Sequence, residues 1–373
     1  MGTYAPDTGG AFTFQDSILR ALCSINSTHE IVCFYYEGKE SISDGSVQWV
    51  RLIRTPSKQG DRPLHEAVLR HNIELVWFIS TDVEVINVPF VYILWDLQHR
   101  TQPYFPEVSV SGWTWDNRER FYQYVLPRAA YVITGTQAGK NEVMDYYRVP
   151  AERIRILPFP TPEDVLRPST PLTPGAAAIK TPYLLYPAQF WPHKNHVALL
   201  LALKILVERE QLDFSVVLTG SDQGNQKYIR ETVAELGLTE RVHFLGFVPR
   251  KELIQLYQGA FALVFPSFFG PDNLPPLEAF ALGCPVIAAQ VPGADEQLGD
   301  AVLRFDPKDE MQLAAAVKKL HATPGLRETL KQRGHIRARG RTAEDYARDM
   351  LKIVDEFSPI RRCWSSREAY KHT

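Results

Sequence analysis

The alternation of short apolar runs with helical patterns along almost the whole chain constrains its fold more than any other feature. Runs rich in β-branched and aromatic residues are separated by segments of helical periodicity, which is typical of parallel α/β layers. In the first half this pattern predicts strands at 30–36, 48–53, 74–79, 89–94, 130–134 and 153–157, and helices at 11–22, 116–126 and 137–147. In the second half it predicts strands at 183–187, 214–218, 242–245, 262–265 and 285–288, each next to a helix.

A dense run of prolines interrupts this alternation. Seven prolines lie between Pro158 and Pro182, and proline at that density stiffens a chain and blocks sheet pairing. A chain of 373 residues also fits two domains. We therefore expect a first Rossmann-like domain over 1–165, a second over 166–345 and a helical tail over 346–373. The two domains should face each other across a cleft, with ligands beyond the carboxyl ends of the strands.

The beginning of the first domain departs from the usual Rossmann-like pattern. Such a domain opens with a buried strand, and a glycine-rich turn follows that strand. Here the turn, Asp7-Thr8-Gly9-Gly10, has too few residues before it for such a strand. Two explanations stay open: the fold lacks its first strand, or the start is truncated.

Composition narrows the class of protein. The chain is 45% hydrophobic and 23% charged, which indicates a globular protein. Its formal net charge of -2 argues against nucleic acid as the main partner. Cys23, Cys33, Cys284 and Cys363 are scattered, as expected for reduced thiols. With no signal-peptide pattern and no run long enough for a transmembrane helix, we expect a cytoplasmic protein whose only membrane contact is peripheral, at the inner face.

The segment 265–287 has the pattern of a strand, a loop, a helix and a second strand. Pro275 and Pro276 suit the first turn of that helix. The backbone N–H groups of residues 273–277, together with the helix dipole, would form a site for a diphosphate. Glu278 lies one turn further on, where its carboxylate could accept hydrogen bonds from two ribose hydroxyls. The alternative is that Glu278 caps the helix.

A second informative segment, 186–196, leaves the first strand of the second domain. Lys194 would lie at the carboxyl end of that strand, where an ammonium can neutralise the charge that builds on a leaving diphosphate. The alternative is a solvated loop lysine. His193 and His196 have the spacing of a metal-binding pair, but no third ligand accompanies them. We expect these histidines at the start of a helix, and we expect no metal or other cofactor.

These segments resemble family 4 of the retaining glycosyltransferases, particularly members that build bacterial surface polysaccharides. The resemblance spans nearly the whole chain and implies the GT-B fold, with a C-terminal helix that crosses back to the first domain. It also implies a hexosyltransferase that uses a nucleotide sugar. The matching stretches are "WDLQHRTQPYFPEVS", "VITGTQAGKNEV", "PAQFWPHKNH", "VVLTGSDQGN", "RVHFLGFVP" and "NLPPLEAFALGCPVIAA".

In the second domain the resemblance implies a complete donor site. Lys194 would bind the diphosphate, and Glu278 would hold the ribose hydroxyls. The backbone at Asn273 and Leu274 would contact phosphate. The turn Gly246-Phe247-Val248 would lie against the nucleobase.

In the first domain the implied residues are fewer. Gly9 and Gly10 would let the backbone approach the donor phosphates, as glycine permits. Asp96 or His99 would lie near the acceptor hydroxyl, as the catalytic side chain of this domain. For His99, a purely structural role is an equal alternative.

Three positions depart from the family pattern. Gln189 stands where the family often has an arginine beside the phosphate lysine, and Gly270 stands eight residues before Glu278 where an acidic residue is usual. The family's histidine-aspartate pair is Trp95-Asp96 here. Because Asp272 is the nearest carboxylate to Gly270, we expect Asp272 to replace part of the missing contact with the donor sugar, and Asn273 could also donate to that sugar.

The resemblance implies transfer with retention and without a metal. The nearest string to a metal-binding Asp-x-Asp is Asp82-Val-Glu84, which we interpret as structural. UDP-glucose is favoured as the donor over GDP-mannose, and the acceptor would be a glycan or a lipid-linked sugar. Two alternatives remain at this point: a GT-B epimerase or phosphorylase, and a non-catalytic subunit that binds a sugar nucleotide. An NAD-dependent enzyme is excluded because no GxGxxG follows a strand.

Overall fold

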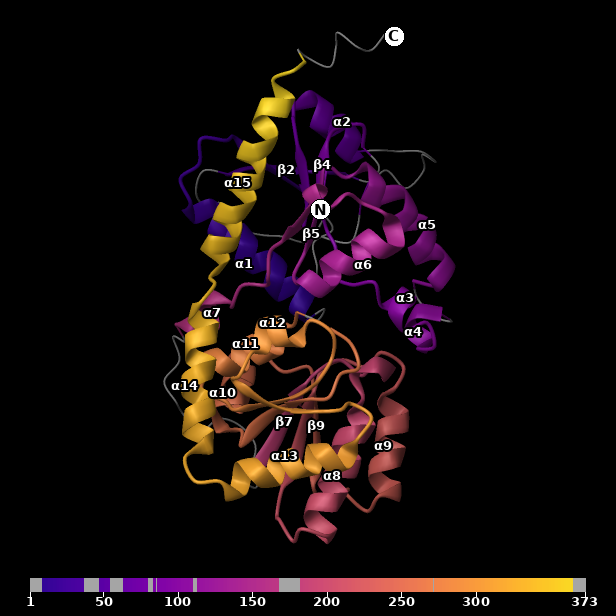
Figure 1. Ribbon diagram of the computed structural model, residues 1–373, viewed down its shortest axis with the longest axis vertical. Helices are drawn as coiled ribbons and strands as arrows, with labels where there is room; N and C mark the ends of the chain where they lie inside the picture. The colour runs from indigo at the N-terminus through magenta and orange to yellow at the C-terminus, as the bar shows by residue number, and fades with distance from the viewer. Residues whose placement is uncertain are drawn as a thin grey trace.

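The computed structural model describes residues 9–36, 47–53, 63–79, 83–84, 86–109, 113–167, 182–270 and 272–364. Two α/β domains lie one above the other, the first at the top and the second at the bottom of Figure 1. Short parallel strands alternate with helices in both domains, so the predicted α/β class is confirmed. Of the helices described, none combines the length and the apolarity that crossing a membrane requires.

The first domain contains most of the elements that the sequence pattern predicts, together with short helices that it does not predict. The predicted helices correspond to α1, α5 and α6, whereas α2, α3 and α4 were not predicted. In chain order the elements are α1 (Gly10–Ser24), β1 (Ile31–Tyr35), β2 (Val47–Arg51), α2 (Pro63–Arg70), β3 (Val76–Phe78), β4 (Phe90–Ile93), α3 (Gln98–Thr101), α4 (Pro106–Ser109), α5 (Trp115–Val125), η2 (Leu126–Arg128), β5 (Tyr131–Thr134), α6 (Gln137–Tyr147), η3 (Ala151–Arg153) and β6 (Ile154–Ile156).

The strands of this domain form two separate parallel sheets, β1-β2 and β3-β4-β5-β6. Strands β4 and β5 are buried along their whole length, as expected where helices cover both faces of a parallel sheet. Glu84, from the string that the sequence analysis interpreted as structural, accepts hydrogen bonds from the N–H groups of Leu64 and His65 in the first turn of α2. That carboxylate therefore caps a helix.

A cavity of about 380 Å³ lies between β1 and β3. In a sheet of Rossmann-like order, 3-2-1-4-5-6, the first strand lies between the second and the fourth. In this comparison β1 and β2 correspond to the second and third strands of the Rossmann order, and β3 corresponds to the fourth. The cavity between β1 and β3 therefore lies at the position of the first strand. The question of a missing first strand concerns the residues ahead of Gly9, which lie outside the described part of the chain.

The connection between the domains is described only in part. It includes α7 (Glu163–Leu166), and the predicted boundary after residue 165 falls inside this helix. The later prolines of the predicted linker, at 168, 171 and 174, lie outside the described residues.

The second domain is a regular alternation of strands and helices around one six-stranded parallel sheet. Its elements are β7 (Tyr183–Pro187), η4 (Pro192–Lys194), α8 (His196–Glu208), β8 (Ser215–Thr219), α9 (Gln226–Glu235), β9 (Val242–Gly246), α10 (Arg250–Gly259), β10 (Ala262–Phe265), α11 (Leu274–Ala281), β11 (Val286–Ala289), α12 (Ala294–Leu298), β12 (Val302–Phe305) and α13 (Glu310–Ala322).

The strand order of this sheet is β12-β11-β10-β7-β8-β9. This is the doubly wound Rossmann order, in which the direction of winding reverses between β7 and β10. In such sheets ligands bind beyond the carboxyl ends of the strands at that switch point. The loops that follow β7 and β10 are therefore the first place to look for a site.

The last two helices return the chain to the first domain. Helix α14 (Leu326–Arg339) packs against α11, and α15 (Ala343–Arg361) packs against α1 (Figure 1). Thr342 and Asp345 form a capping box at the start of α15, which satisfies backbone donors there. The predicted return of the C-terminal helix is confirmed, and the helix begins at Ala343, slightly before the predicted tail at 346.

Candidate active site

The N-termini of two helices from different domains meet at the switch point of the second sheet. Helix α11 follows β10 and begins at Leu274, and α1 of the first domain begins at Gly10. A side-chain carbon placed on Gly10 would lie 3.7 Å from Leu274 Cδ1. Neither helix carries a side-chain cap at this end, so the partial positive charges of both N-termini face one region. Both regions are predicted from the sequence to bind the donor phosphates, and the structure brings them together.

The α11 terminus offers fewer backbone donors than the sequence predicted. The Asn273 N–H donates to Gln297 Oε1 at 3.1 Å, and Pro275 and Pro276 have no N–H to give. Among the described residues, the Leu274 N–H is the donor at this terminus that has no acceptor. Gln297 lies on α12, and no local sequence signal connects it with residue 273.

Lys194 ends the short helix η4 after β7, at the same switch point. Its ammonium lies 5.5 Å from the centre of the Phe265 ring. No ion pair with a described carboxylate closer than 4.0 Å is seen. Burial lowers the pKa of Lys194 to about 8, against the opposing influence of the Asp96 and Glu107 carboxylates. An unpaired ammonium of this kind is available to an anionic ligand.

The two histidines beside Lys194 have separate structural roles. His196 is the first residue of α8 and stacks on Phe190 with ring centres 4.6 Å apart. His193 lies in η4. Both therefore lie at helix starts, as the sequence analysis expected. Within the described part of the chain, no three metal-ligating side chains gather in one place.

Glu278 makes contacts that neither sequence interpretation foresaw. It is buried on α11, where Oε1 accepts a hydrogen bond from Arg250 at 2.6 Å and Oε2 accepts one from the Tyr257 hydroxyl at 2.9 Å. Arg250 also pairs with Asp164 of α7. The capping interpretation is wrong, because Glu278 lies beyond the first turn of α11 and accepts from side chains. A ribose role would require the carboxylate to share these partners or release them.

Asp272 joins the two domains in this structure. Its Oδ2 accepts a hydrogen bond from the Phe159 N–H at 2.6 Å, and its Oδ1 accepts one from Gln297. The carboxylate lies so close to Gly135 that a side-chain carbon there would come within 2.9 Å of Asp272 Cβ. Burial raises the pKa of Asp272 to about 7. Both oxygens of the carboxylate proposed to contact the donor sugar are thus occupied.

Gly270 has the backbone conformation that favours glycine, with φ of 117°. A side chain at this position would collide with the side chain of Asn273, whose amide donates to the Gly270 carbonyl. The glycine in place of the family's acidic residue therefore matches the local backbone.

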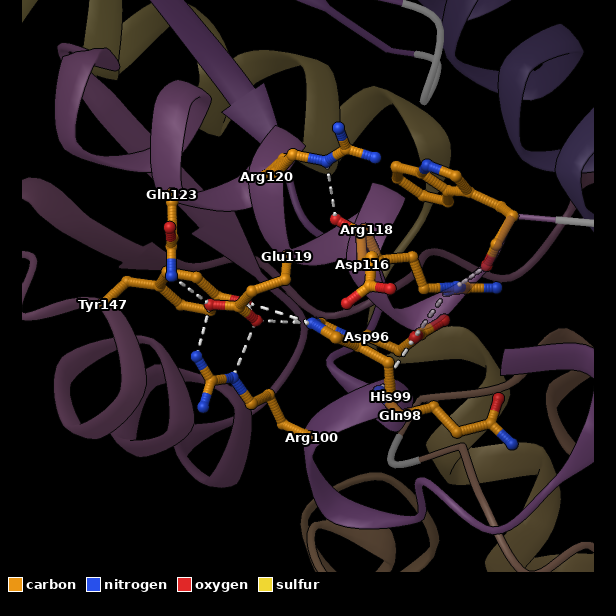
Figure 2. A network of polar contacts seen from close by, with 11 residues as sticks. Asp96, Gln98, His99, Arg100, Asp116, Arg118, Glu119, Arg120, Gln123 and Tyr147 are labelled. Carbon is orange, nitrogen blue, oxygen red and sulfur yellow. Dashed lines mark hydrogen bonds and ion pairs between the residues drawn. The ribbon is translucent and has the colours of Figure 1, made fainter. Parts of the chain in front are cut away.

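Asp96 lies at the carboxyl end of β4 and lines a small cavity with Glu142 and Asp272. Its Oδ1 accepts from the Gln98 N–H at 3.1 Å, and Arg118 lies 3.9 Å away (Figure 2). Burial, assisted by the charge of Asp96, raises the pKa of Glu142 to about 7. Asp96 therefore lies at the interface with the second domain, and its role near the acceptor hydroxyl stays a prediction. Sequence reasoning did not single out Glu142.

His99 points away from that cavity into the first domain. Its Nε2 lies 3.1 Å from both Glu119 and the Tyr147 hydroxyl, and Arg100 pairs with the same Glu119 (Figure 2). The side chain is fully buried, and burial lowers the pKa of His99. These contacts favour the structural alternative for this histidine.

Gln189 and the turn at 246–248 lie along the same edge of the second sheet, toward β9. Gln189 Nε2 donates to Ser221 Oγ at 3.1 Å, so the loops after β7 and β8 are joined. Phe247 is 54% exposed directly after β9, whereas Val248 is buried. An exposed aromatic ring at this place can stack on a planar base.

A second contact between the domains was not predicted. Glu107 of α4 lies 2.5 Å from His193 Nδ1 and also accepts the His193 N–H. Nearby, Gln102 donates to the Phe268 carbonyl at 2.8 Å. Burial lowers the pKa of His193, so a neutral ring donates to the carboxylate. Pairings of this kind join distant segments and leave no local sequence signal.

Comparison with solved structures defines the class of fold. Sucrose-phosphate synthase from Thermosynechococcus elongatus is similar with a TM-score of 0.72 at 19% identity, covering 96% of this chain and 95% of that one. Together with the two Rossmann-like domains and the returning helix, this similarity shows that the chain has the GT-B fold.

Comparison with a family model and with curated proteins finds matches over part of the chain. Residues 175–337 match the family model described as Glycosyl transferases group 1. The O-antigen chain mannosyltransferase B of Escherichia coli is 28% identical over 219 residues, which is 57% of each chain. The O-antigen chain mannosyltransferase RfbU of Salmonella typhimurium is 27% identical over 200 residues, which is 53% of each. The chain thus matches little more than half the length of these relatives.

Proposed function

We propose that this chain is a glycosyltransferase that moves a hexosyl group from a nucleotide-diphosphate sugar to an acceptor hydroxyl in polysaccharide biosynthesis. One observation carries the proposal: the N-termini of α1 and α11 meet at the switch point of the second sheet, where Lys194 ends η4 without a described carboxylate partner. Two helix N-termini and an ammonium favour an anion with several charges, such as a diphosphate. The match of residues 175–337 to a glycosyltransferase family supports the same activity.

In the proposed reaction the bond between the anomeric carbon and the diphosphate oxygen breaks, and a bond from that carbon to the acceptor oxygen forms. The electron pair of the broken bond stays on the diphosphate. Lys194 and the Leu274 N–H would stabilise that charge. The acceptor proton would pass to a phosphate oxygen of the same diphosphate, on the same face of the sugar. This route retains the anomeric configuration, as members of family 4 are expected to do.

The reaction so written requires no metal ion. The ammonium and the helix N-termini would supply the positive charge that a divalent cation supplies in metal-dependent transferases. A melting temperature that rises with a donor and is insensitive to EDTA would agree with this. Binding that strictly requires manganese would contradict it.

The order of the strands suggests how the donor lies. Phe247 follows β9 at one end of the sheet, and Lys194 and α11 follow the central strands β7 and β10. A nucleotide sugar could place its base on Phe247 and its phosphates at the switch point. The sugar would then lie beyond the phosphates, toward β11 and β12.

The donor is either a mannosyl or a glucosyl nucleotide. UDP-glucose is the donor favoured from the sequence, but two of the similar curated proteins are named mannosyltransferases. We therefore place GDP-mannose first and UDP-glucose second.

A panel of nucleotide sugars in a thermal-shift assay tests the proposal first, because a ligand that binds only the folded state raises its melting temperature. Release of nucleoside diphosphate is then measured with and without an oligosaccharide acceptor. Release that depends on the acceptor is expected. Turnover of the sugar nucleotide without an acceptor would favour an epimerase or phosphorylase, and binding without turnover would indicate a non-catalytic subunit.

A further inference from the structure

An open hollow of about 590 Å³ lies at the edge of the interface between the two domains, beyond the predicted donor site. The first domain contributes Gln102 and Tyr104, and the second contributes Phe268 and the loops that follow β11 and β12. This volume falls within the range of roughly 300–1,000 Å³ that small-ligand sites occupy. No described side chain fills it.

The hollow lies on the side of the switch point opposite to Phe247. Across the second sheet the order is β9, β8, β7, β10, β11, β12. If the base lies at β9 and the phosphates at β7 and β10, the transferred sugar points toward β11 and β12. An acceptor must approach the anomeric carbon from this side. The hollow is therefore in the position that an acceptor would occupy.

Tyr104 is held with its ring in solvent at one wall of this hollow. The side chain is 69% exposed, although its neighbour Phe105 packs against Phe268 with ring centres 5.7 Å apart. Gln102, two residues earlier, donates to the Phe268 carbonyl. The segment is thus anchored to the second domain on both sides of Tyr104. An anchored aromatic ring offers a flat apolar surface at low entropic cost.

The opposite wall carries polar groups of the kind that bind hydroxyls. Gln290 and Gln312 carry amides, and Asp306 and Lys308 carry charges, all four exposed to solvent. The amides are held in place: Gln312 accepts from the Asp306 N–H and donates to Asp309, and Gln290 donates to Asp295, which leaves one amide hydrogen of each exposed glutamine for a ligand. These side chains can donate to and accept from the ring hydroxyls of a sugar. Beneath them, Arg304 has one guanidinium nitrogen, Nη1, without a partner in the described structure. The aromatic ring of Tyr104 together with these amides and charges suits a sugar ring, which has an apolar face and polar hydroxyls around its edge.

We propose that this hollow is the acceptor subsite, in which the terminal sugar of a glycan acceptor stacks on Tyr104 and hydrogen-bonds to the loops after β11 and β12. The proposal rests on the proposed function, because an acceptor exists only if the chain transfers a sugar. It assigns recognition of the acceptor to both domains, so that the acceptor is bound only when they are together.

The test compares Tyr104→Ala with Tyr124→Ala, since Tyr124 is an exposed tyrosine on α5, outside the residues that line the hollow. The substrate is a short oligosaccharide that supports release of nucleoside diphosphate. Tyr104→Ala should raise the KM for the acceptor by about tenfold or more, in line with the loss of one aromatic stacking contact. The melting-temperature rise with the donor should stay as in the unmodified chain. Tyr124→Ala should change none of these.

Two further variants separate the outcomes. Gln312→Ala should also raise the acceptor KM, and Tyr104→Phe should restore most of the affinity, because the ring is the surface that is used. An unchanged acceptor KM in both Tyr104→Ala and Gln312→Ala would overturn the subsite while leaving the transferase intact. Failure of the unmodified chain to bind any nucleotide sugar would instead overturn the proposed function on which the subsite rests.

Discussion

Lys194 is the residue on which the proposed chemistry depends most, because it is the ammonium at the switch point that lacks a close carboxylate partner. Lys194→Ala should lower turnover by about 10²–10³-fold, the usual effect of losing one preorganised group that stabilises developing charge. Steady-state release of nucleoside diphosphate measures it. Lys227→Ala on the exposed face of α9 is the control. Activity within a few-fold of the unmodified chain would show that Lys194 has no part in the chemistry.

The pKa of Lys194 leads to a dependence of rate on pH. Burial lowers the pKa of this ammonium to about 8, and the proposed role needs the protonated form. The kcat/KM for the donor should therefore fall as the pH rises through about 8, since kcat/KM reports the ionisation of the free enzyme. Lys194→Arg remains charged in this range. The kcat/KM that the Lys194→Arg variant retains should not fall as the pH rises through about 8. If it falls in this variant as it does in the unmodified chain, the ionisation belongs to another group.

Glu278 shows how an expected binding residue can have a different set of partners in the fold. Its carboxylate accepts from Arg250 and Tyr257, so Glu278→Ala removes a charged hydrogen bond and leaves the Tyr257 hydroxyl without this acceptor, whereas Arg250 keeps its pairing with Asp164. We expect the free energy of unfolding to fall by roughly 1.5–3 kcal/mol, as measured by denaturant titration. Glu235→Ala, an exposed change on α9, should have little effect. A large loss of donor affinity with unchanged stability would instead support the ribose role.

At the scale of secondary-structure elements, the loop before α11 connects the second domain to the first through Asp272. Because Asp272 accepts from the Phe159 N–H and from Gln297, its removal should loosen this contact and leave any bond to the sugar unaffected. Asp272→Ala should thus weaken binding of a nucleotide sugar and of the nucleoside diphosphate by similar factors. Isothermal titration of both ligands measures this, with the exposed Asp300→Ala as a control. A loss of affinity for the nucleotide sugar alone would support the hypothesis that Asp272 contacts the donor sugar.

The elements themselves were largely predictable from the sequence, and the contacts between them were not. Buried parallel strands such as β4 and β10 are continuous apolar runs, which local patterning detects. Short helices such as α3 and α4, with four residues each, have too few turns for a periodic signal. Lys194 and α11 could be placed because they follow strands at the switch point. The partners Gln297, Arg250 and Glu107 come from other elements, and only the folded chain brings them to the site.

At the scale of the whole molecule, α15 joins the two ends of the chain. Tyr346 on this helix is fully buried and contacts Phe14 of α1 and Trp77 of β3, with ring centres 5.5 and 6.3 Å away. Tyr346→Ala should cost about 3–5 kcal/mol of unfolding free energy, the range for removing a large buried aromatic ring. Thermal unfolding followed by circular dichroism measures it.

Tyr346→Phe is the matched variant for this prediction. The Tyr346 hydroxyl is buried without a hydrogen-bond partner in the described structure. Its removal should therefore leave stability within about 1 kcal/mol of the unmodified chain or raise it slightly. A loss in the phenylalanine variant as large as in the alanine variant would mean that the hydroxyl, and not the ring, supports the interface.

The return of α15 to the first domain has a consequence for synthesis on the ribosome. Domains that emerge early usually fold while the rest of the chain is still being made. Here Met350, Ile353 and Phe357 complete a hydrophobic cluster that includes residues of α1, β4 and β5. The first domain therefore stays incomplete until translation reaches the last helix. A product interrupted shortly before residue 343 would expose that cluster and would be a ready substrate for cellular proteases.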